Sequence, residues 1–416
     1  MLDVSGLNSQ RNKFSFRAAV AIFASAFLVF SLGAVSSTAA GAKVGQACAK
    51  AKQTVKVTGG SLVCTKAGKN LKWSYPKATV RLAVASSTIQ ANNDVAVIAV
   101  AKGMKYYAKE NIEVETILTA GSTAAVQAVA SGQADITAAD LGAIMAASQR
   151  NVPLKAIGGL VSVWPWRIAV LPNSPIRTAA DLKGKKIGII ALTSGSYPYA
   201  RGVAEGANLD ADKDVQYVVT GLGAPAANAL TNGSVDALAL YTAVYEQIKS
   251  AGTAIRYLDN PASFNGVRSI SWTASNAFIE SQGQVIERFL RASNKALTFS
   301  GTSPEKAMYV GYEVYPVLLA GSSKAARIEP DIRALTAWLE SAGISEPGTT
   351  KGWPKTWGDI PVQDWLRSQA FATSAGQIKG PITIDDVWEP KFLKAANDFK
   401  RESIIKQAKK YKPNTN

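Results

Sequence analysis

From Val80 onward, short runs rich in β-branched and other apolar residues alternate with longer segments in which apolar residues recur every three or four positions. The short runs predict β-strands and the longer segments predict amphipathic helices. The expected strands cover residues 80–85, 112–117, 135–138, 152–157, 185–190, 215–219 and 235–240. The expected helices cover residues 95–107, 122–131, 141–149, 224–232, 280–298 and 392–411. This alternation of strands and helices indicates an α/β fold.

Two of the expected strand-to-helix connections contain glycine and hydroxyl side chains: Gly121-Ser122-Thr123 and Ser194-Gly195-Ser196-Tyr197. Unpaired backbone N–H groups at a helix start, together with the helix dipole, favour an anionic or acceptor-rich ligand. In α/β sheets such loops collect at the carboxyl ends of the strands, where ligands bind. Asp140 follows the expected strand 135–138 at the same edge. A serine in such a loop could instead only cap its helix, and both interpretations stay open.

The N-terminal residues 1–40 have the pattern of an export signal. Arg11, Lys13 and Arg17 precede an uncharged run from Ala18 to Val35, and small residues follow it. This order predicts a signal peptide that is cleaved near residue 40, so the mature chain is expected outside the cytoplasm, in the periplasm or cell envelope. An uncleaved membrane anchor is the alternative, because the apolar run is close to the shortest that can span a bilayer.

Residues 43–77 predict a small basic module ahead of the main domain. The segment contains eight lysines, no acidic residue, and both cysteines of the chain, Cys48 and Cys64. In an exported protein these cysteines are expected to form a disulfide, which a β module of this size needs for stability. The module could be a spacer between the membrane and the main domain. It could also attach the protein to an anionic polymer of the cell envelope.

Composition excludes several classes of function. The chain has no histidine, so it has neither Ser-His-Asp nor Cys-His catalysis, and two cysteines are too few for a Cys₄ metal site. We therefore expect no catalytic residues, no metal and no cofactor. The net charge of +16 suits an anionic partner, but the sequence has no zinc-finger, helix-turn-helix or RNA-binding signature. We expect no nucleic-acid partner.

Three segments resemble one protein family: AKGMKYYAKENIEVE at 101–115, GSTAAVQAVASGQAD at 121–135 and NSPIRTAADLKGKKIG at 173–188. These motifs are similar to those of the NMT1-like solute-binding proteins of ABC importers for sulfonates, taurine, nitrate, bicarbonate or thiamine-type pyrimidines. The resemblance implies a two-lobed, periplasmic-binding-protein-like fold of type II with the ligand between the lobes. It also implies a monomer that delivers its ligand to an ABC permease in the membrane.

The resemblance divides the mature chain after the basic module. Residues 79–172 are expected to begin lobe 1, residues 173–268 to form lobe 2, and residues 269–416 to return to lobe 1 and end in a helical extension. The segment 345–390, rich in Trp, Pro and Gly, is expected to wrap lobe 1.

The resemblance also assigns candidate ligand-binding residues, which lie in loops after strands of both lobes. These candidates are Thr88, Gln90, Ser122, Thr123, Asp140, Trp166, Ser194, Gly195, Ser196, Tyr197 and Tyr241. Serine and threonine at two helix starts favour a small organic anion such as a sulfonate or taurine. A thiamine-type pyrimidine, nitrate or bicarbonate is the alternative, as is an envelope-attached sensor. A pyrimidine synthase of this fold would consume an active-site histidine, so we do not expect an enzyme.

Overall fold

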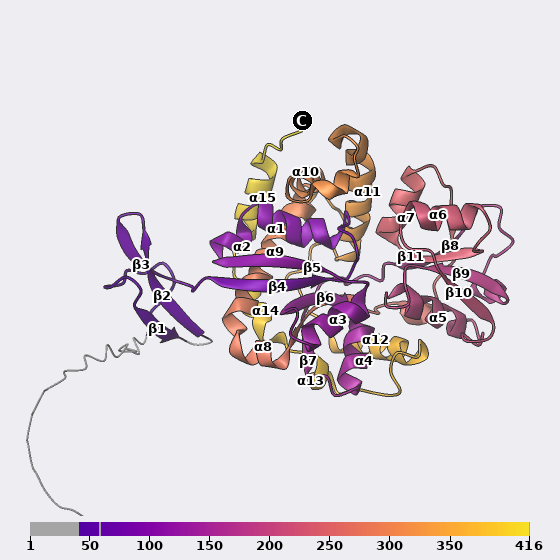
Figure 1. The fold of residues 1–416 in the computed structure, drawn as a ribbon, viewed down its shortest axis with the longest axis horizontal. Coiled ribbons are helices and arrows are strands. Elements are labelled where there is room, and N and C mark those ends of the chain that lie inside the picture. Colours follow the sequence, from indigo (N-terminus) through magenta and orange to yellow (C-terminus); the bar gives the residue numbers. More distant parts are fainter. Residues whose placement is uncertain (1–40, 58–59, 416) are drawn as a thin grey trace, which may run out of the picture.

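The computed structural model describes residues 41–415 apart from 58–59, and the expected signal peptide lies outside this part of the chain. Figure 1 shows a small β module at one end of the long axis, a large lobe 1 in the middle and lobe 2 at the other end. Within the described residues, no helix is both long and apolar enough to span a bilayer.

Lobe 1 is built on a five-stranded sheet with the order β5-β4-β6-β13-β7. Its strands are β4 (Ala78–Val84), β5 (Ile112–Leu118), β6 (Ile136–Asp140), β7 (Leu154–Gly159) and β13 (Ile270–Ser275). Strand β4 runs parallel to β5 and β6, whereas β13 runs antiparallel to β6 and β7. The first four residues of β6 are buried, as expected for a central strand that helices cover on both faces.

Lobe 2 repeats this arrangement with the order β10-β9-β11-β8-β12. Its strands are β8 (Trp166–Val170), β9 (Lys185–Ile189), β10 (Val215–Val219), β11 (Ala237–Tyr241) and β12 (Arg256–Tyr257). Here β9 runs parallel to β10 and β11, and β8 runs antiparallel to β11 and β12. The chain therefore crosses between the lobes twice, after β7 and again before β13.

Helices cover both sheets (Figure 1). Those of lobe 1 are the π-helix η1 (Asp94–Ala99), α1 (Val100–Gly103), α2 (Tyr106–Lys109), α3 (Ser122–Ala130), α4 (Leu141–Gln149), α8 (Asn276–Ser281), α9 (Gly283–Thr302) and α10 (Pro304–Val314). Those of lobe 2 are the 3₁₀ turns η2 (Ala179–Leu182) and η3 (Ala262–Phe264) with α5 (Ser196–Gly206), α6 (Ala224–Thr231) and α7 (Thr242–Ser250). Helix α9 lies at the centre of the lobe 1 core, where Phe289 stacks on Tyr107 and contacts Trp272 edge-on.

The C-terminal extension follows α10 and contacts both lobes. Its elements are η4 (Pro316–Leu319), α11 (Lys324–Ser341), α12 (Val362–Ser374), α13 (Ile384–Val387), η5 (Pro390–Phe392), α14 (Leu393–Ala396) and α15 (Arg401–Lys410). Helix α11 packs along α7 of lobe 2, and α12 contacts α4 of lobe 1 as well as α5 of lobe 2. The segment 345–390 contacts lobe 1, as expected, through α12 and α13, and α12 also reaches α5, so the segment bridges the two lobes.

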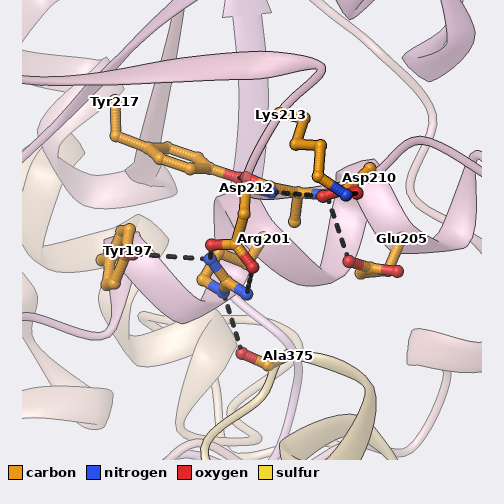
Figure 2. Close-up of polar contacts among 9 residues, drawn as sticks. Tyr197, Arg201, Glu205, Asp210, Asp212, Lys213, Tyr217 and Ala375 are labelled. Atoms are coloured by element: carbon orange, nitrogen blue, oxygen red, sulfur yellow. Dashed lines mark hydrogen bonds and ion pairs between the residues drawn. The ribbon is translucent and has the colours of Figure 1, made fainter.

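Arg201 of α5 fixes the end of this bridge to lobe 2 (Figure 2). Its guanidinium forms an ion pair with Asp212, and its Nε donates to the carbonyl oxygen of Ala375 at 3.3 Å. Phe371 of α12 contacts the rings of Trp164 and Phe264 edge-on, with centroids 4.8 and 5.0 Å away. Polar and aromatic contacts thus hold the extension against lobe 2.

The β module consists of β1 (Thr54–Val57), β2 (Gly60–Ala67) and β3 (Asn70–Ser74), paired as an antiparallel sheet. Residues 43–53, the covering segment, pack against this sheet: Cys48 contacts its buried side chains, and backbone N–H groups of the segment donate to carbonyl oxygens of β2 and β3. The buried side chains are Val55, Leu62, Cys64 and Trp73. The predicted disulfide between Cys48 and Cys64 is present and joins the covering segment to β2.

Removing this disulfide is expected to unfold the module without affecting the lobes. A bridge between residues 16 apart contributes about 3 kcal/mol by restricting the unfolded chain, which is large for so small a core. In limited trypsin digestion, a variant with Cys48→Ser and Cys64→Ser is expected to be cut within residues 41–74 at least tenfold faster than the wild type. Equal cleavage rates in the two proteins would contradict this role of the disulfide.

Several element boundaries differ from the sequence-based expectation, and the helix expected at 392–411 is interrupted between α14 and α15. The helix expected at 95–107 is divided at Lys105, which adopts a left-handed conformation between α1 and α2. The helix expected at 280–298 is two helices, α8 and α9, separated at Gln282. The strand expected at 135–138 extends to Asp140, so this residue is the last of β6 and does not follow it.

Candidate ligand-binding site

A cavity of about 490 Å³ lies between the two lobes. It is lined by residues at or just after the carboxyl ends of β4, β6, β9 and β11, which are the positions where α/β sheets bind ligands. Helix α11 of the extension adds Trp338 and Ser341 to the lining. The volume is in the range of small-molecule sites.

Most of the candidate residues meet at this cavity. Those in its lining are Thr88, Gln90, Ser122, Asp140, Trp166, Ser194, Gly195 and Tyr241. Thr123 and Tyr197 line an adjoining hollow of about 300 Å³, which shares Ser122, Asp140, Ser194 and Gly195 with the main cavity.

Ser196 lies behind its loop and lines neither space. Its side chain is fully buried, and its Oγ accepts a hydrogen bond from the backbone N–H of Ile190 at 2.9 Å. Arg167, another residue at the lobe crossing, directs its guanidinium to the carbonyl oxygens of Trp164 and Trp166. Neither side chain is placed to contact a ligand in the cavity.

Asp140 is the half-buried carboxylate at the end of β6. Its two oxygens accept hydrogen bonds from the hydroxyl groups of Ser269, at 2.6 Å, and Ser122, at 2.9 Å. Ser122 Oγ also accepts from the backbone N–H of Asp140, so Ser122 does not cap α3, which begins after Gly121. Burial raises the pKa of Asp140 above its usual range, and the two serine hydrogen bonds partly offset this shift.

Asp94 is a second carboxylate in the lining, and it is 1% exposed. It accepts hydrogen bonds from the backbone N–H of Gln90 at 3.0 Å and from the side-chain amide of Asn93 at 2.9 Å. Burial raises the pKa of Asp94 from 3.8 to about 7, because a charged carboxylate is poorly solvated there. Sequence reasoning did not identify Asp94 as a site residue; an acidic residue directly before the apolar run 95–101 was the signal for a buried charge.

This buried carboxyl predicts an unusual pH dependence of stability. Between about pH 4 and pH 7 the folded protein holds a proton on Asp94 that the unfolded chain has released, so the free energy of unfolding falls as pH rises. Asp94→Asn removes this titration and keeps an acceptor for the Gln90 N–H. By denaturant unfolding, the variant is expected to exceed the wild type by more than about 1 kcal/mol at pH 8 and to match it near pH 4.

The control for this prediction is Asp398→Asn, which changes an exposed carboxylate on the extension. Its stability is expected to follow the wild type across the same pH range. Parallel pH profiles of the wild type and Asp94→Asn would show that Asp94 titrates normally, and they would contradict the prediction.

Aromatic side chains form another part of the lining. Trp166 is 5% exposed, stacks on Tyr199 and meets the ring of Tyr241 edge-on at 5.5 Å. Trp338 comes from α11, far along the chain from Trp166 and Tyr241, and nothing in the sequence indicated it. Among the residues that line the cavity there is no lysine or arginine. The main cavity is therefore polar, aromatic and acidic, whereas Arg150 and Arg201 line the adjoining hollow.

The rims of the lobes touch beside the cavity. Thr193 of lobe 2 donates from its Oγ1 to the carbonyl oxygen of Ala120 at 2.8 Å and accepts from the backbone N–H of Thr123 at 3.2 Å. A Cβ atom added to Gly195 would lie 2.2 Å from Asp140 Oδ2, so lobe 2 approaches lobe 1 closely at this glycine. The two Gly-Ser loops thus meet, and the cleft is closed at this rim.

A metal site is not indicated by the side chains. Across residues 41–415, the unplaced pair 58–59 excepted, no group of three or more His, Cys, Asp or Glu side chains could hold an ion. The cavity can offer the carboxyl groups of Asp94 and Asp140 and several hydroxyl and amide groups as hydrogen-bond partners, and its aromatic rings can stack on a flat ligand.

Two sheets of the same strand order, joined by two crossings around an internal cavity, define a two-lobed periplasmic-binding-protein-like fold. A sequence model described as "NMT1/THI5 like" matches residues 92–307, which is more than half of the chain. The protein belongs to this NMT1/THI5-like family, as the sequence motifs predicted.

Relatives and solved structures agree with this fold. The riboflavin-binding protein RibY of Chloroflexus aurantiacus is 24% identical over 71% of this chain and 81% of its own length. A formylaminopyrimidine-binding protein of Halalkalibacterium halodurans is 22% identical over 65% of this chain and 82% of its own length. The periplasmic aliphatic sulphonate-binding protein SsuA of Escherichia coli superimposes with a TM-score of 0.56 at 20% identity, covering 75% of this chain and 92% of that one.

Proposed function

We propose that the protein is the extracytoplasmic solute-binding component of an ABC importer, and that its cleft captures a small, flat heteroaromatic solute that donates hydrogen bonds. The observation that carries this proposal is the lining of the cavity. The carboxylates of Asp94 and Asp140 lie there with the rings of Trp166, Tyr241 and Trp338, and no lysine or arginine accompanies them.

The acidic lining favours the alternative that the sequence left open over a sulfonate or taurine. An organic anion in this cavity would lie near Asp140 without a cation in the lining to offset the repulsion. A ring with amino or imide N–H groups would instead donate to the carboxylate, and hydrogen bonds to charged groups are among the stronger ones. The aromatic side chains would stack on such a ring.

The relatives support a ring ligand. The two described above are named as binders of riboflavin and of formylaminopyrimidine, both of which contain flat nitrogen heterocycles. The sulphonate-binding neighbour is 20% identical and supports the shared fold rather than its ligand for this chain.

Binding would stabilise the closed arrangement of the lobes. A solute that contacts Asp140 of lobe 1 and Trp166 of lobe 2 has a higher affinity for the closed state, and the population shifts toward it. The closed protein would then dock on a membrane permease. The chain has no G-x-x-x-x-G-K-[ST] motif, so a separate ATPase would supply the energy of transport. This role requires export, in line with the signal peptide expected at residues 1–40.

The glycine at the closing rim provides a test of this role. Gly195 has an ordinary backbone conformation, with φ of −59°, so the chief obstacle to alanine is Asp140 of lobe 1, and its Cβ would also lie 3.0 Å from the Trp166 ring of its own lobe. Gly195→Ala is expected to weaken binding of a cleft ligand at least tenfold in calorimetric titration, with little change in melting temperature.

A matched glycine serves as the control for this experiment. Gly380 has open space around its Cβ position, and Gly380→Ala is expected to bind as the wild type does. Unchanged affinity in Gly195→Ala would show that the ligand does not bind by closure of these lobes.

A further inference from the structure

The β module carries an exceptional share of the protein's positive charge. Residues 41–77 hold eight of the 46 basic residues and none of the 30 acidic ones. Half of the net charge of +16 therefore lies in less than a tenth of the chain. All eight lysine side chains are exposed, and Lys77, the last of them, forms an ion pair with Glu113 of lobe 1.

The remaining lysines are spread over the surface of the module. Lys56 of β1 and Lys72 of β3 pair in register with Ser61 and Thr65 of β2, on the sheet face opposite the buried side chains. Lys66 and Lys69 lie at the turn between β2 and β3, and Lys43, Lys50 and Lys52 lie on the covering segment. A surface of ammonium and hydroxyl donors is suited to phosphate or carboxylate groups.

The module is folded, whereas a simple spacer would need neither a packed core nor a disulfide. It has its own buried core of Val55, Leu62, Cys64 and Trp73 and its own disulfide. The linker that follows is fixed to lobe 1, where Asn111 donates to the carbonyl oxygen of Tyr75 and Arg288 lies over the Tyr75 ring at 4.7 Å. Lysines on such a scaffold keep their spacing, so less entropy is lost when they bind a repeating anion.

Its place in the molecule leaves the cleft free. Figure 1 shows the module at the end of the long axis opposite lobe 2, beyond the lobe 1 sheet. A partner held there would contact neither the rims that close the cavity nor lobe 2.

We propose that the β module binds a flexible polyanionic polymer with closely spaced phosphate or carboxylate groups, and that it tethers the binding protein to such a polymer in the cell envelope. The lysines point out from several sides of the module, which suits a chain that winds around it. A flat bilayer would engage one side. Among the described residues of the module, Val44 is the one large apolar side chain that is markedly exposed. The module therefore has little apolar surface that could insert into a lipid bilayer.

The test compares two variants of the mature chain, residues 41–416, that lose the same charge in different places. The module variant replaces Lys52, Lys56, Lys69 and Lys72 with glutamine. The control variant replaces four exposed lysines of the C-terminal extension, Lys379, Lys394, Lys400 and Lys406, with glutamine. A third protein carries arginine at the four module positions, which keeps the charge and shows whether the module tolerates substitution there.

Binding is measured to inorganic polyphosphate, to poly-L-glutamate and to phosphatidylglycerol vesicles, at low salt and at physiological salt. We expect the wild type, the control variant and the arginine variant to bind polyphosphate or polyglutamate, and the module variant to bind at least tenfold more weakly. We also expect binding to fall steeply as salt rises, because counterions are released on association.

Three results would overturn the proposal. Failure of the wild type to bind either polymer at low salt would exclude the polyanion. Equal loss of binding in the module and control variants would show that net charge alone is responsible. Binding to vesicles but to neither polymer would identify a membrane surface as the partner. None of these results depends on the cleft ligand, so they leave the proposed function unaffected.

Discussion

Replacing Asp140 with asparagine is expected to weaken binding of a heteroaromatic solute by about 10- to 100-fold. Asparagine keeps the shape of the side chain and can still bond to the hydroxyl groups of Ser122 and Ser269. It removes the carboxylate that accepts hydrogen bonds from the ligand, and a hydrogen bond to a charged group contributes about 1.5–3 kcal/mol. Each 1.4 kcal/mol corresponds to a factor of about ten in affinity.

The sign of this effect discriminates between ligand classes. If the ligand is a sulfonate or another anion, Asp140→Asn removes a repulsive charge and affinity rises. Calorimetric titration of the wild type and the variant with the same ligand measures the difference directly. Burial raises the pKa of Asp140, which means that the charge of this carboxylate does not stabilise the folded protein. Asparagine is therefore not expected to lower the melting temperature. A loss of affinity in the variant can then be assigned to the binding site. Tighter binding in the variant would contradict the proposed ligand class.

Replacing Glu110 with alanine is expected to reduce the free energy of unfolding by about 3–5 kcal/mol. Glu110 follows α2, and its side chain is 8% exposed. It pairs with two cations of α9, Arg291 at 2.8 Å and Lys295 at 2.7 Å. Removing one member of a buried charge cluster leaves the others without compensation, and this is the costly change. Denaturant unfolding of both proteins measures the loss.

A matched control lies three residues away on β5. Glu113 pairs with Lys77, but both side chains are more than half exposed, so Glu113→Ala is expected to change stability little. The two variants remove the same side chain from neighbouring positions, and burial is what differs. Equal effects of the two substitutions would contradict the assigned role of the Glu110 cluster.

The same cluster predicts a pH dependence opposite in sign to that of Asp94. Burial by itself raises the pKa of Glu110, but the hydrogen bonds and charges of Arg291 and Lys295 outweigh it, and the pKa lies below the usual 4.5. The contribution of Glu110 is thus present above about pH 4.5 and is lost as pH falls through the folded pKa. In Glu110→Ala this part of the acid destabilisation is expected to be absent.

Local signals in the sequence predicted the strands and loops that build the cavity. Gly121-Ser122-Thr123 and Ser194–Tyr197 follow strands and precede helices, and the structure brings both loops to the closing rim. The disulfide between Cys48 and Cys64 was also predictable, because the sequence predicts export and oxidising compartments favour disulfides. These features depend on residues close together in sequence or on the compartment.

Features that depend on distant packing were not predictable. Lys105 divides a helix that local propensity would continue, and the neighbouring Gly103 lies against Val310 of α10. Trp338 reaches the cavity because α11 packs on α7, about ninety residues earlier in the chain. The helix α11 was not among those expected from the sequence, and hydrophobic periodicity cannot specify against which lobe a helix packs.

The proposed ligand class rests on side-chain contacts, which the sequence does not specify either. Hydroxyl groups at helix starts favour an anion in the sequence, but Ser122, at the start of α3, donates its hydrogen bond to Asp140, as does Ser269 before β13. Their donor groups are used within the protein, and what the cavity presents is a carboxylate. A sequence identifies the residue types at such a site but not which of them bond to one another.

The central claim is that the cleft binds a flat heteroaromatic solute, and a thermal-shift panel on residues 41–416 tests it most directly. The panel contains riboflavin, a formylaminopyrimidine, taurine and an alkanesulfonate. A ligand at about 100 times its dissociation constant adds about 2.7 kcal/mol of stability, which is readily measured. The account predicts that a ring compound raises the melting temperature and that the two sulfonates leave it unchanged. Stabilisation by taurine or the alkanesulfonate, and by neither ring compound, would contradict it.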